Sequence, residues 1–143
     1  MDHKIFTIDE HEMWMEIDDG LVWATGAEQK RINYKPYELN VKTPSEHHVD
    51  GIQFDAEIQI PMTKEGEPEG AVNAVMSIFL DHSRAFYHND FIEQFGCIKD
   101  FANRRDRCVG KDIKLSDFIQ SLDVSTYFEY AGSLTQPPCT EGV

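Results

Sequence analysis

The chain has 143 residues, 41% of them hydrophobic, and a formal net charge of −13 at pH 7. This length and apolar content suffice for a buried core, so we expect one globular domain over residues 1–143. The negative charge argues against nucleic acid as a partner. Direct insertion into a membrane is not expected either, because no apolar run approaches the roughly 20 residues that span a bilayer. The first residues do not resemble a secretory signal, and the localisation stays open.

Alternating apolar and polar residues predict strands in the first part of the chain. Residues 4–22 alternate on both sides of an Asp-Asp-Gly turn at 18–20, which predicts a β-hairpin because glycine adopts positive φ without strain. A second turn is predicted at Thr25-Gly26. Residues 31–42 and 52–60 predict two further strands, each with an apolar face and a polar face.

Two more strands are predicted further along the chain. A polar loop at 63–70 contains too many turn-forming residues for a regular element. The apolar run at 72–80 that follows it is typical of a strand buried on both faces. Residues 126–130 predict the last strand.

Two helices are predicted between these strands. Apolar residues recur at helical spacing over 90–104, and Asp90 with Glu93 forms a capping-box pattern at the start. A shorter helix is predicted over 117–122, with Ser116 as its N-terminal cap.

Three blocks of sequence are the most specific. They are Thr43-Pro44-Ser45-Glu46-His47-His48-Val49-Asp50-Gly51 followed by Ala56-Glu57-Ile58, then Ala74-Val75-Met76-Ser77-Ile78-Phe79-Leu80, then residues 127–143 with Gly132-Ser133-Leu134-Thr135-Gln136-Pro137-Pro138-Cys139. In order and spacing these blocks resemble the α-class carbonic anhydrase family. The resemblance implies a mixed β fold with peripheral α, in which a few surface helices flank a large, mostly antiparallel central sheet. Family members are much longer, so the chain resembles their middle part and is expected to be truncated at both ends.

The resemblance also implies where a metal would bind. In this family three histidines hold zinc, and their positions fall on Asn40, Lys42 and Gln59 of this chain. Amide oxygens are poor zinc ligands and an ammonium group repels the ion, so we expect no metal and no other cofactor. Without a metal, the pKa of a bound water is not lowered from about 15.7 to about 7, and no hydroxide is available to attack CO2.

Other family positions are retained. Thr135 and Glu46 match the pair that orients the zinc-bound hydroxide, and Glu57 matches the acid that supports the third histidine. A weaker match, Glu10-His11, places His11 at the position that carries protons. Residues of this kind orient ligands but do not replace them, so none of them is expected to be catalytic.

Lys42 falls where the dication would lie. If Glu46 and Glu57 are close to it, its ammonium group compensates two buried carboxylates, because opposite charges within about 4–6 Å favour the ionised forms. The alternative is that the Lys42 side chain extends into solvent.

Three functional hypotheses follow. The first is a catalytically inactive carbonic anhydrase-like domain that serves as a structural or interaction subunit of a larger assembly, in which other protein chains cover exposed sheet edges. The second is an active zinc-dependent carbonate dehydratase with an atypical metal site. The third is a small-molecule binding module whose cavity is lined by Asn40, Lys42, Gln59 and Thr135, with an anionic ligand near Lys42.

Overall fold

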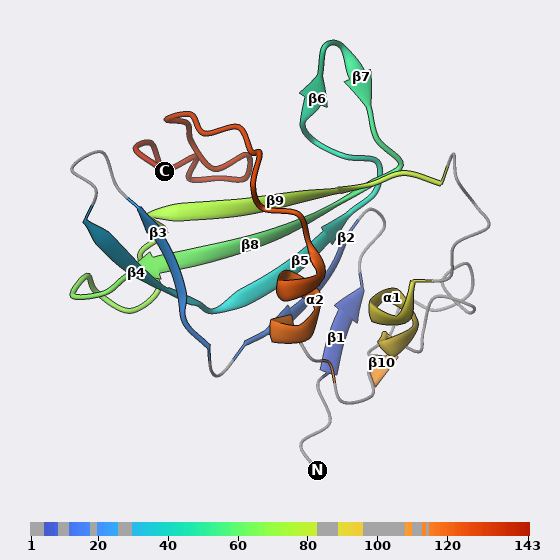
Figure 1. Ribbon diagram of the computed structural model, residues 1–143, viewed down its shortest axis with the longest axis horizontal. Coiled ribbons are helices and arrows are strands. Elements are labelled where there is room, and N and C mark those ends of the chain that lie inside the picture. Colours follow the sequence, from blue (N-terminus) through green and yellow to red (C-terminus); the bar gives the residue numbers. More distant parts are fainter. Residues whose placement is uncertain are drawn as a thin grey trace.

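The computed structural model describes residues 5–8, 12–17, 20–25, 30–82, 89–95, 108–109, 113 and 115–143. Eight strands form one sheet in the order β10-β1-β2-β5-β8-β4-β3, with β9 also paired to β8 (Figure 1). These strands are β1 (Ile5–Ile8), β2 (Glu12–Glu16), β3 (Val22–Thr25), β4 (Arg31–Pro36), β5 (Glu38–Lys42), β8 (Ala56–Lys64), β9 (Ala74–Leu80) and β10 (Cys108–Val109). The remaining elements are the hairpin strands β6 (His48–Val49) and β7 (Ile52–Gln53) and the helices α1 (Asp90–Gln94) and α2 (Leu115–Ser121). Every strand pair among the described residues is antiparallel, as the predicted fold class requires.

Strand β8 is the centre of the sheet. It pairs with β5 through residues 57–59, with β4 through 62–64 and with β9 through 56–62. Seven of its nine residues are buried, because neighbouring strands flank it and side chains cover both of its faces. Its position fixes the placement of β9 and of β5, and β5 carries Glu38, Asn40 and Lys42 of the polar site described below.

The segment predicted as one strand over 31–42 is divided into β4 and β5. Between the pairs Pro36–Met62 and Asn40–Gln59 the segment has one residue more than β8, which makes a β-bulge. The backbone N–H of Tyr37 donates to the Pro61 carbonyl at 3.3 Å. A bulge of this kind turns a side chain away from the regular alternation, and this one lies beside the cavity described below.

One face of the sheet is hydrophobic and packs against both helices. The buried core consists of Met13, Met15, Leu39, Ile58, Ile60, Met62, Phe91, Phe95 and Phe118. Phe91 of α1 stacks on Phe118 of α2, with ring centroids 3.8 Å apart. Because side chains alternate along a strand, the residues between these core positions point to the opposite face of the sheet.

Both helices differ from their predicted boundaries. Helix α1 begins after Asn89, whose side chain accepts hydrogen bonds from the backbone N–H groups of Phe91 and Ile92, so the cap precedes the predicted Asp90–Glu93 box. The described part of this helix ends at Gln94, and residues 96–104 lie outside the described residues. Helix α2 begins at Leu115, which places Ser116 inside the helix rather than at its cap.

Three strand predictions are corrected. The turn at 18–20 does not close a hairpin, because β2 pairs with β1 and β5, whereas β3 pairs with β4 across the second predicted turn. Strand β9 is half-buried along its length rather than buried on both faces. Residues 126–130 form no strand, and their aromatic side chains are exposed.

A short hairpin projects beyond the end of the main sheet. Strands β6 and β7 are joined by Asp50 and Gly51, both at positive φ, as a two-residue hairpin turn requires (Figure 1). The helices of the described part are all too short or too polar to cross a membrane.

Candidate functional site

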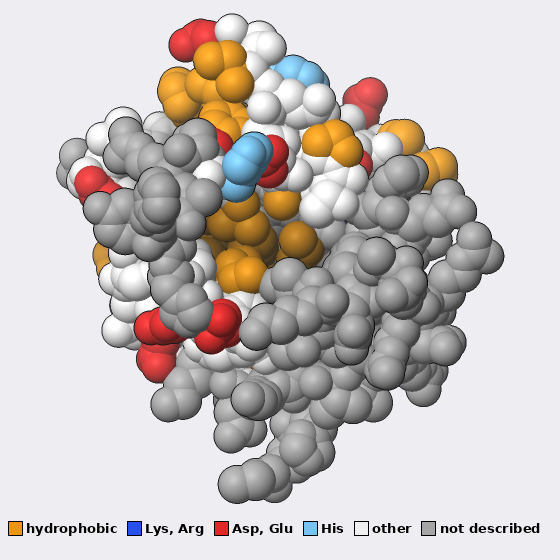
Figure 2. All heavy atoms as spheres, turned by 90° about the vertical axis from the view of Figure 1, so that its right-hand side faces the viewer, with side chains coloured by type: hydrophobic (Ala, Val, Ile, Leu, Met, Phe, Trp, Pro, Cys, Tyr) orange, Lys and Arg blue, Asp and Glu red, His pale blue; other side chains and the backbone are white. Residues whose placement is uncertain are grey.

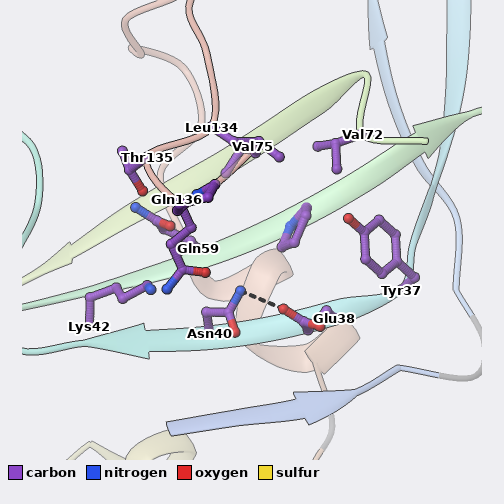
Figure 3. A pocket seen from close by; sticks show the side chains of 12 residues that line it. Tyr37, Glu38, Asn40, Lys42, Gln59, Val72, Val75, Leu134, Thr135 and Gln136 are labelled. Atoms are coloured by element: carbon purple, nitrogen blue, oxygen red, sulfur yellow. Dashed lines mark hydrogen bonds between the residues drawn. The ribbon is translucent and has the colours of Figure 1, made fainter. Parts of the chain in front are cut away.

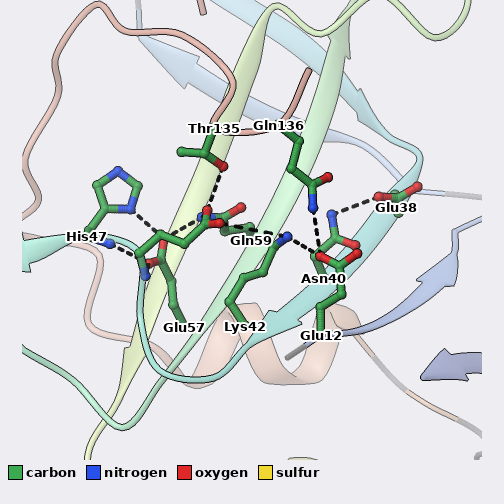
Figure 4. Close-up of polar contacts among 10 residues, drawn as sticks. Glu12, Glu38, Asn40, Lys42, His47, Glu57, Gln59, Thr135 and Gln136 are labelled. Atoms are coloured by element: carbon green, nitrogen blue, oxygen red, sulfur yellow. Dashed lines mark hydrogen bonds and ion pairs between the residues drawn. The ribbon is translucent and has the colours of Figure 1, made fainter. Parts of the chain in front are cut away.

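Three neighbouring strands bring polar side chains to the sheet face opposite the helices. Lys42 of β5 lies opposite Glu12 of β2 on one side and opposite Glu57 of β8 on the other. Asn40 lies opposite Gln59. Cross-strand partners point to the same face of a sheet, so Asn40, Lys42 and Gln59 form one polar cluster (Figure 4).

The ammonium group of Lys42 is the cation of this cluster. Lys42 Nζ forms an ion pair with Glu12, and Glu46 Oε1 lies 3.9 Å from the same nitrogen. The Lys42 side chain is only 8% exposed, whereas the side chains of Glu12 and Glu46 are 24% and 30% exposed. Lys42 is therefore held between two carboxylates and does not extend into solvent.

Glu57 is fully buried and is surrounded by hydrogen-bond donors. Its Oε2 accepts from the backbone N–H groups of Glu46 and His47, each at 3.0 Å. Its Oε1 accepts from Gln59 Nε2 at 2.9 Å and lies 2.6 Å from His47 Nδ1. Burial by itself would raise the pKa of Glu57, but hydrogen bonds from His47, Gln59 and Ser77 outweigh it and hold the pKa below its ordinary value.

The C-terminal segment completes the cluster from the other end of the sequence. Thr135 Oγ1 donates to Glu46 Oε2 at 2.6 Å, and Gln136 Nε2 donates to Glu12 Oε2 at 3.0 Å (Figure 4). The segment is folded back on itself, since Gly132 N donates to the Val143 carbonyl at 2.8 Å. Glu12 and Glu46, which both contact Lys42, are thereby hydrogen-bonded to residues more than 85 positions away in the sequence.

A cavity of about 190 Å³ lies between this cluster and the C-terminal segment (Figure 3). Its lining is divided into polar residues (Glu38, Asn40, Lys42, Gln59, Thr135, Gln136), apolar residues (Pro61, Val72, Val75, Leu134, Pro137) and Tyr37. Burial, and to a lesser extent the Glu38 charge, raises the pKa of Tyr37, so the phenol is protonated at neutral pH. These polar and apolar sets of residues are called the polar wall and the apolar wall below.

The structure gathers most of the residues predicted from sequence. Asn40, Lys42, Gln59 and Thr135 line the cavity, as expected. His11 lies outside the described residues.

One of the two predicted partners of Lys42 is confirmed, because Glu46 pairs with it. Glu57 lies opposite Lys42 across the strand pair and accepts its hydrogen bonds from other donors, so its compensation by the Lys42 charge stays a prediction. The nearest partner of Lys42 is Glu12, which was not predicted from the sequence. The alternation of Met13 and Met15 places Glu12 on the polar face, but only the pairing of β2 with β5 reveals its partner.

A cluster of residues of the types that bind metal ions lies apart from the cavity. Ligand atoms of Asp55, Asp81 and His82 are within 4.8 Å of one another, and all three residues are exposed. Hydrogen bonds from His82 lower the pKa of Asp55, and this carboxylate in turn raises the pKa of His82. None of the three lines the cavity. Figure 2 shows histidine and acidic side chains beside exposed hydrophobic ones, and no lysine or arginine of the described residues is visible on that face.

The antiparallel sheet, its helix-covered face and its polar face define a domain with the α-carbonic anhydrase fold. Among solved structures, a fungal α-carbonic anhydrase from Aspergillus oryzae has a TM-score of 0.76 at 22% identity, covering 99% of this chain and 57% of the other. A dioscorin crystallised with ascorbate has a TM-score of 0.68 at 24% identity, covering 98% of this chain and 54% of the other. These likenesses confirm the predicted fold class.

The eukaryotic-type carbonic anhydrase model matches residues 9–143, and the chain belongs to this family. Dioscorin dioA3 of Dioscorea japonica is 34% identical over 113 residues, which are 79% of this chain and 39% of that protein. Human carbonic anhydrase 6 is 30% identical over 143 residues, covering 92% of this chain and 44% of that protein. The chain thus spans less than half the length of these curated relatives.

Replacing Glu57 with glutamine tests the buried hydrogen bonds. The pKa of Glu57 in the folded state is below the ordinary 4.5, so the stabilisation from its charged form is complete above that pH and is lost as the pH falls through the folded-state pKa. At pH 7, Glu57→Gln should lower the free energy of unfolding by about 1–3 kcal/mol, and below about pH 4 the difference should shrink. Urea unfolding from pH 7 to pH 3 measures it. The exposed Glu67→Gln is the control, and a deficit that stays constant with pH would contradict the assignment.

Replacing Lys42 with methionine tests the ion pairs. The change leaves Glu12 and Glu46 without their cation, which should cost about 3 kcal/mol, the lower end for a buried pair because both carboxylates keep some exposure. Thermal unfolding compares this variant with Lys35→Met on β4, where the lysine is exposed and a change within about 0.5 kcal/mol is expected. An unchanged melting temperature for Lys42→Met would exclude a stabilising role for the ammonium group.

Proposed function

We propose that the chain is a catalytically inactive carbonic anhydrase-like domain that acts as a structural or interaction subunit. The observation that carries the proposal is the buried ammonium group of Lys42, paired with Glu12 and Glu46 where the family resemblance places a zinc ligand. An ammonium ion offers no lone pair to a metal and repels it. The carboxylates around it, which would otherwise attract a dication, already have a counter-charge.

The neighbouring groups support the same proposal. Asn40 and Gln59 stand at the other two ligand positions, and both direct their amide nitrogens toward carboxylates. Thr135 and Glu46 keep the hydrogen bond of 2.6 Å that would orient a zinc-bound hydroxide. In this chain that bond connects the C-terminal segment to the cluster, which is a structural role.

Metal analysis and a CO2-hydration assay test the proposal directly. The purified chain should contain no stoichiometric zinc and should not accelerate CO2 hydration, even with zinc added. Asn40→His/Lys42→His/Gln59→His should bind zinc, because three imidazoles then converge on one face. The control Asn40→His/Gln59→His keeps the ammonium group and should bind zinc at least about a hundredfold more weakly, since one ligand is missing and a like charge remains. Stoichiometric zinc with hydration activity in the unaltered chain would overturn the proposal and favour the atypical enzyme.

The interaction role is supported by an exposed aromatic segment after α2. Tyr127, Phe128 and Tyr130 are 67%, 83% and 66% exposed. Clustered apolar side chains on a surface are typical of protein contacts. Strand β9 is also only half-buried and, among the described residues, pairs with β8 alone. We propose that other protein chains cover this part of the domain.

The association state tests the interaction role. The isolated 143-residue chain should associate in a concentration-dependent manner in sedimentation velocity, because the side chains of Tyr127, Phe128 and Tyr130 are mostly exposed. Tyr127→Ser/Phe128→Ser should reduce this association, whereas the matched change Trp23→Ser, at an exposed aromatic on β3, should leave it unaltered. A stable, soluble monomer at all concentrations would contradict an interaction role for this segment.

A further inference from the structure

Carboxylates around the cavity determine which atom of each neighbouring amide side chain, nitrogen or oxygen, points toward them. An ionised carboxylate only accepts hydrogen bonds, so an amide beside it must present its nitrogen. Three amides do so: Asn40 Nδ2 donates to Glu38 at 2.7 Å, Gln136 Nε2 to Glu12 at 3.0 Å, and Gln59 Nε2 to Glu46 at 3.0 Å and Glu57 at 2.9 Å. The hydroxyl of Thr135 also donates its hydrogen bond to Glu46. Gln59 thus uses both of its N–H donors within the protein, and Asn40 and Gln136 use one each.

No described residue donates to Asn40 Oδ1, Gln59 Oε1 or Gln136 Oε1. The Gln59 oxygen is the most informative of the three, because the residue is only 8% exposed. Among the described residues, no fully buried side-chain nitrogen or oxygen lacks a partner, so this oxygen opens into the cavity.

The charge of the cavity is negative. Lys42 is the one cation among the lining residues, and its ammonium group is shared by the carboxylates of Glu12 and Glu46. Glu38 lines the cavity as well, and its partner is a neutral amide. An anion placed near Lys42 would meet these carboxylates and unpaired amide oxygens. The polar wall is thus unsuited to the anionic ligand expected from the sequence.

The apolar wall includes Val72, Val75 and Leu134, and it can cover a short hydrocarbon stem. The cavity volume of about 190 Å³ is below the roughly 300–1,000 Å³ of typical ligand pockets, so the occupant must be small.

We propose that this cavity binds a small organic cation with an N–H-rich head, a primary ammonium or a guanidinium group, on a short apolar stem. The head donates hydrogen bonds to the amide oxygens of Asn40, Gln59 and Gln136, and Glu38 supplies the opposite charge. The stem lies against the apolar wall. The proposal rests on the proposed function in one respect, because it requires the Lys42 ammonium and not a metal ion at the base of the cavity.

Three probes of nearly equal shape test it. n-Butylammonium, n-butanol and butyrate are titrated into the 143-residue chain at constant ionic strength, with binding followed by calorimetry and by the NMR signals of the side-chain amides. Butylammonium should bind saturably, at least about tenfold more tightly than butanol, and should shift the Asn40, Gln59 and Gln136 signals, whereas butyrate should not bind. n-Propylguanidinium then decides between the two heads. Equal or tighter binding of butyrate, or no saturable binding of either cation, would overturn the proposal.

A matched pair of variants locates the site. Glu38→Gln removes the carboxylate that balances the charge and should weaken butylammonium binding about tenfold. Glu69→Gln makes the same change in the exposed loop after β8 and should leave binding unaltered. Equal weakening by both variants would indicate unspecific attraction to an acidic protein and would overturn the site. A zinc-free, inactive chain that binds no cation refutes this inference alone, whereas zinc in the unaltered chain refutes the proposed function.

Discussion

The ion pairs of Lys42 with Glu12 and Glu46 are the contact on which the polar face of this domain depends. They join β2, β5 and the loop after β5, and hydrogen bonds from Gln136 and Thr135 fasten the C-terminal segment to the same two carboxylates. A buried ammonium without these acids, or the acids without it, would leave an uncompensated charge in a poorly solvated place. The arrangement of the cluster follows from that constraint.

The sheet supplies the rigidity that this cluster requires. β8 is buried on both faces and holds Glu57 and Gln59 in register with β5 and β9. Its residues Ile58, Ile60 and Met62 lie in the core, while Gln59 lines the cavity. A single strand therefore serves packing and the polar site through the simple alternation of its side chains.

The sequence predicted this alternation well, and with it the placement of Asn40, Lys42 and Gln59 on one face. It did not predict Glu12 as the partner of Lys42, because the two lie 30 residues apart and their contact depends on which strands pair. Strand pairing is non-local in the same way for β3, which pairs with β4 and not with β2. Two local sequence patterns were also misleading. Asn89 caps the first helix one residue ahead of the predicted cap. Residues 126–130 have a strand-like pattern but pair with no strand and are exposed.

The contact between Tyr130 and His47 connects the surface to the interior. The Tyr130 hydroxyl touches one ring nitrogen of His47, and the other nitrogen lies 2.6 Å from the buried Glu57 carboxylate. Tyr130 is itself 66% exposed and belongs to the aromatic segment. Any molecule that settles on that tyrosine and turns its ring alters the hydrogen bonding of His47, and through it that of an acid at the centre of the sheet. The exterior of the domain and its most deeply placed charge are thus mechanically linked through two side chains.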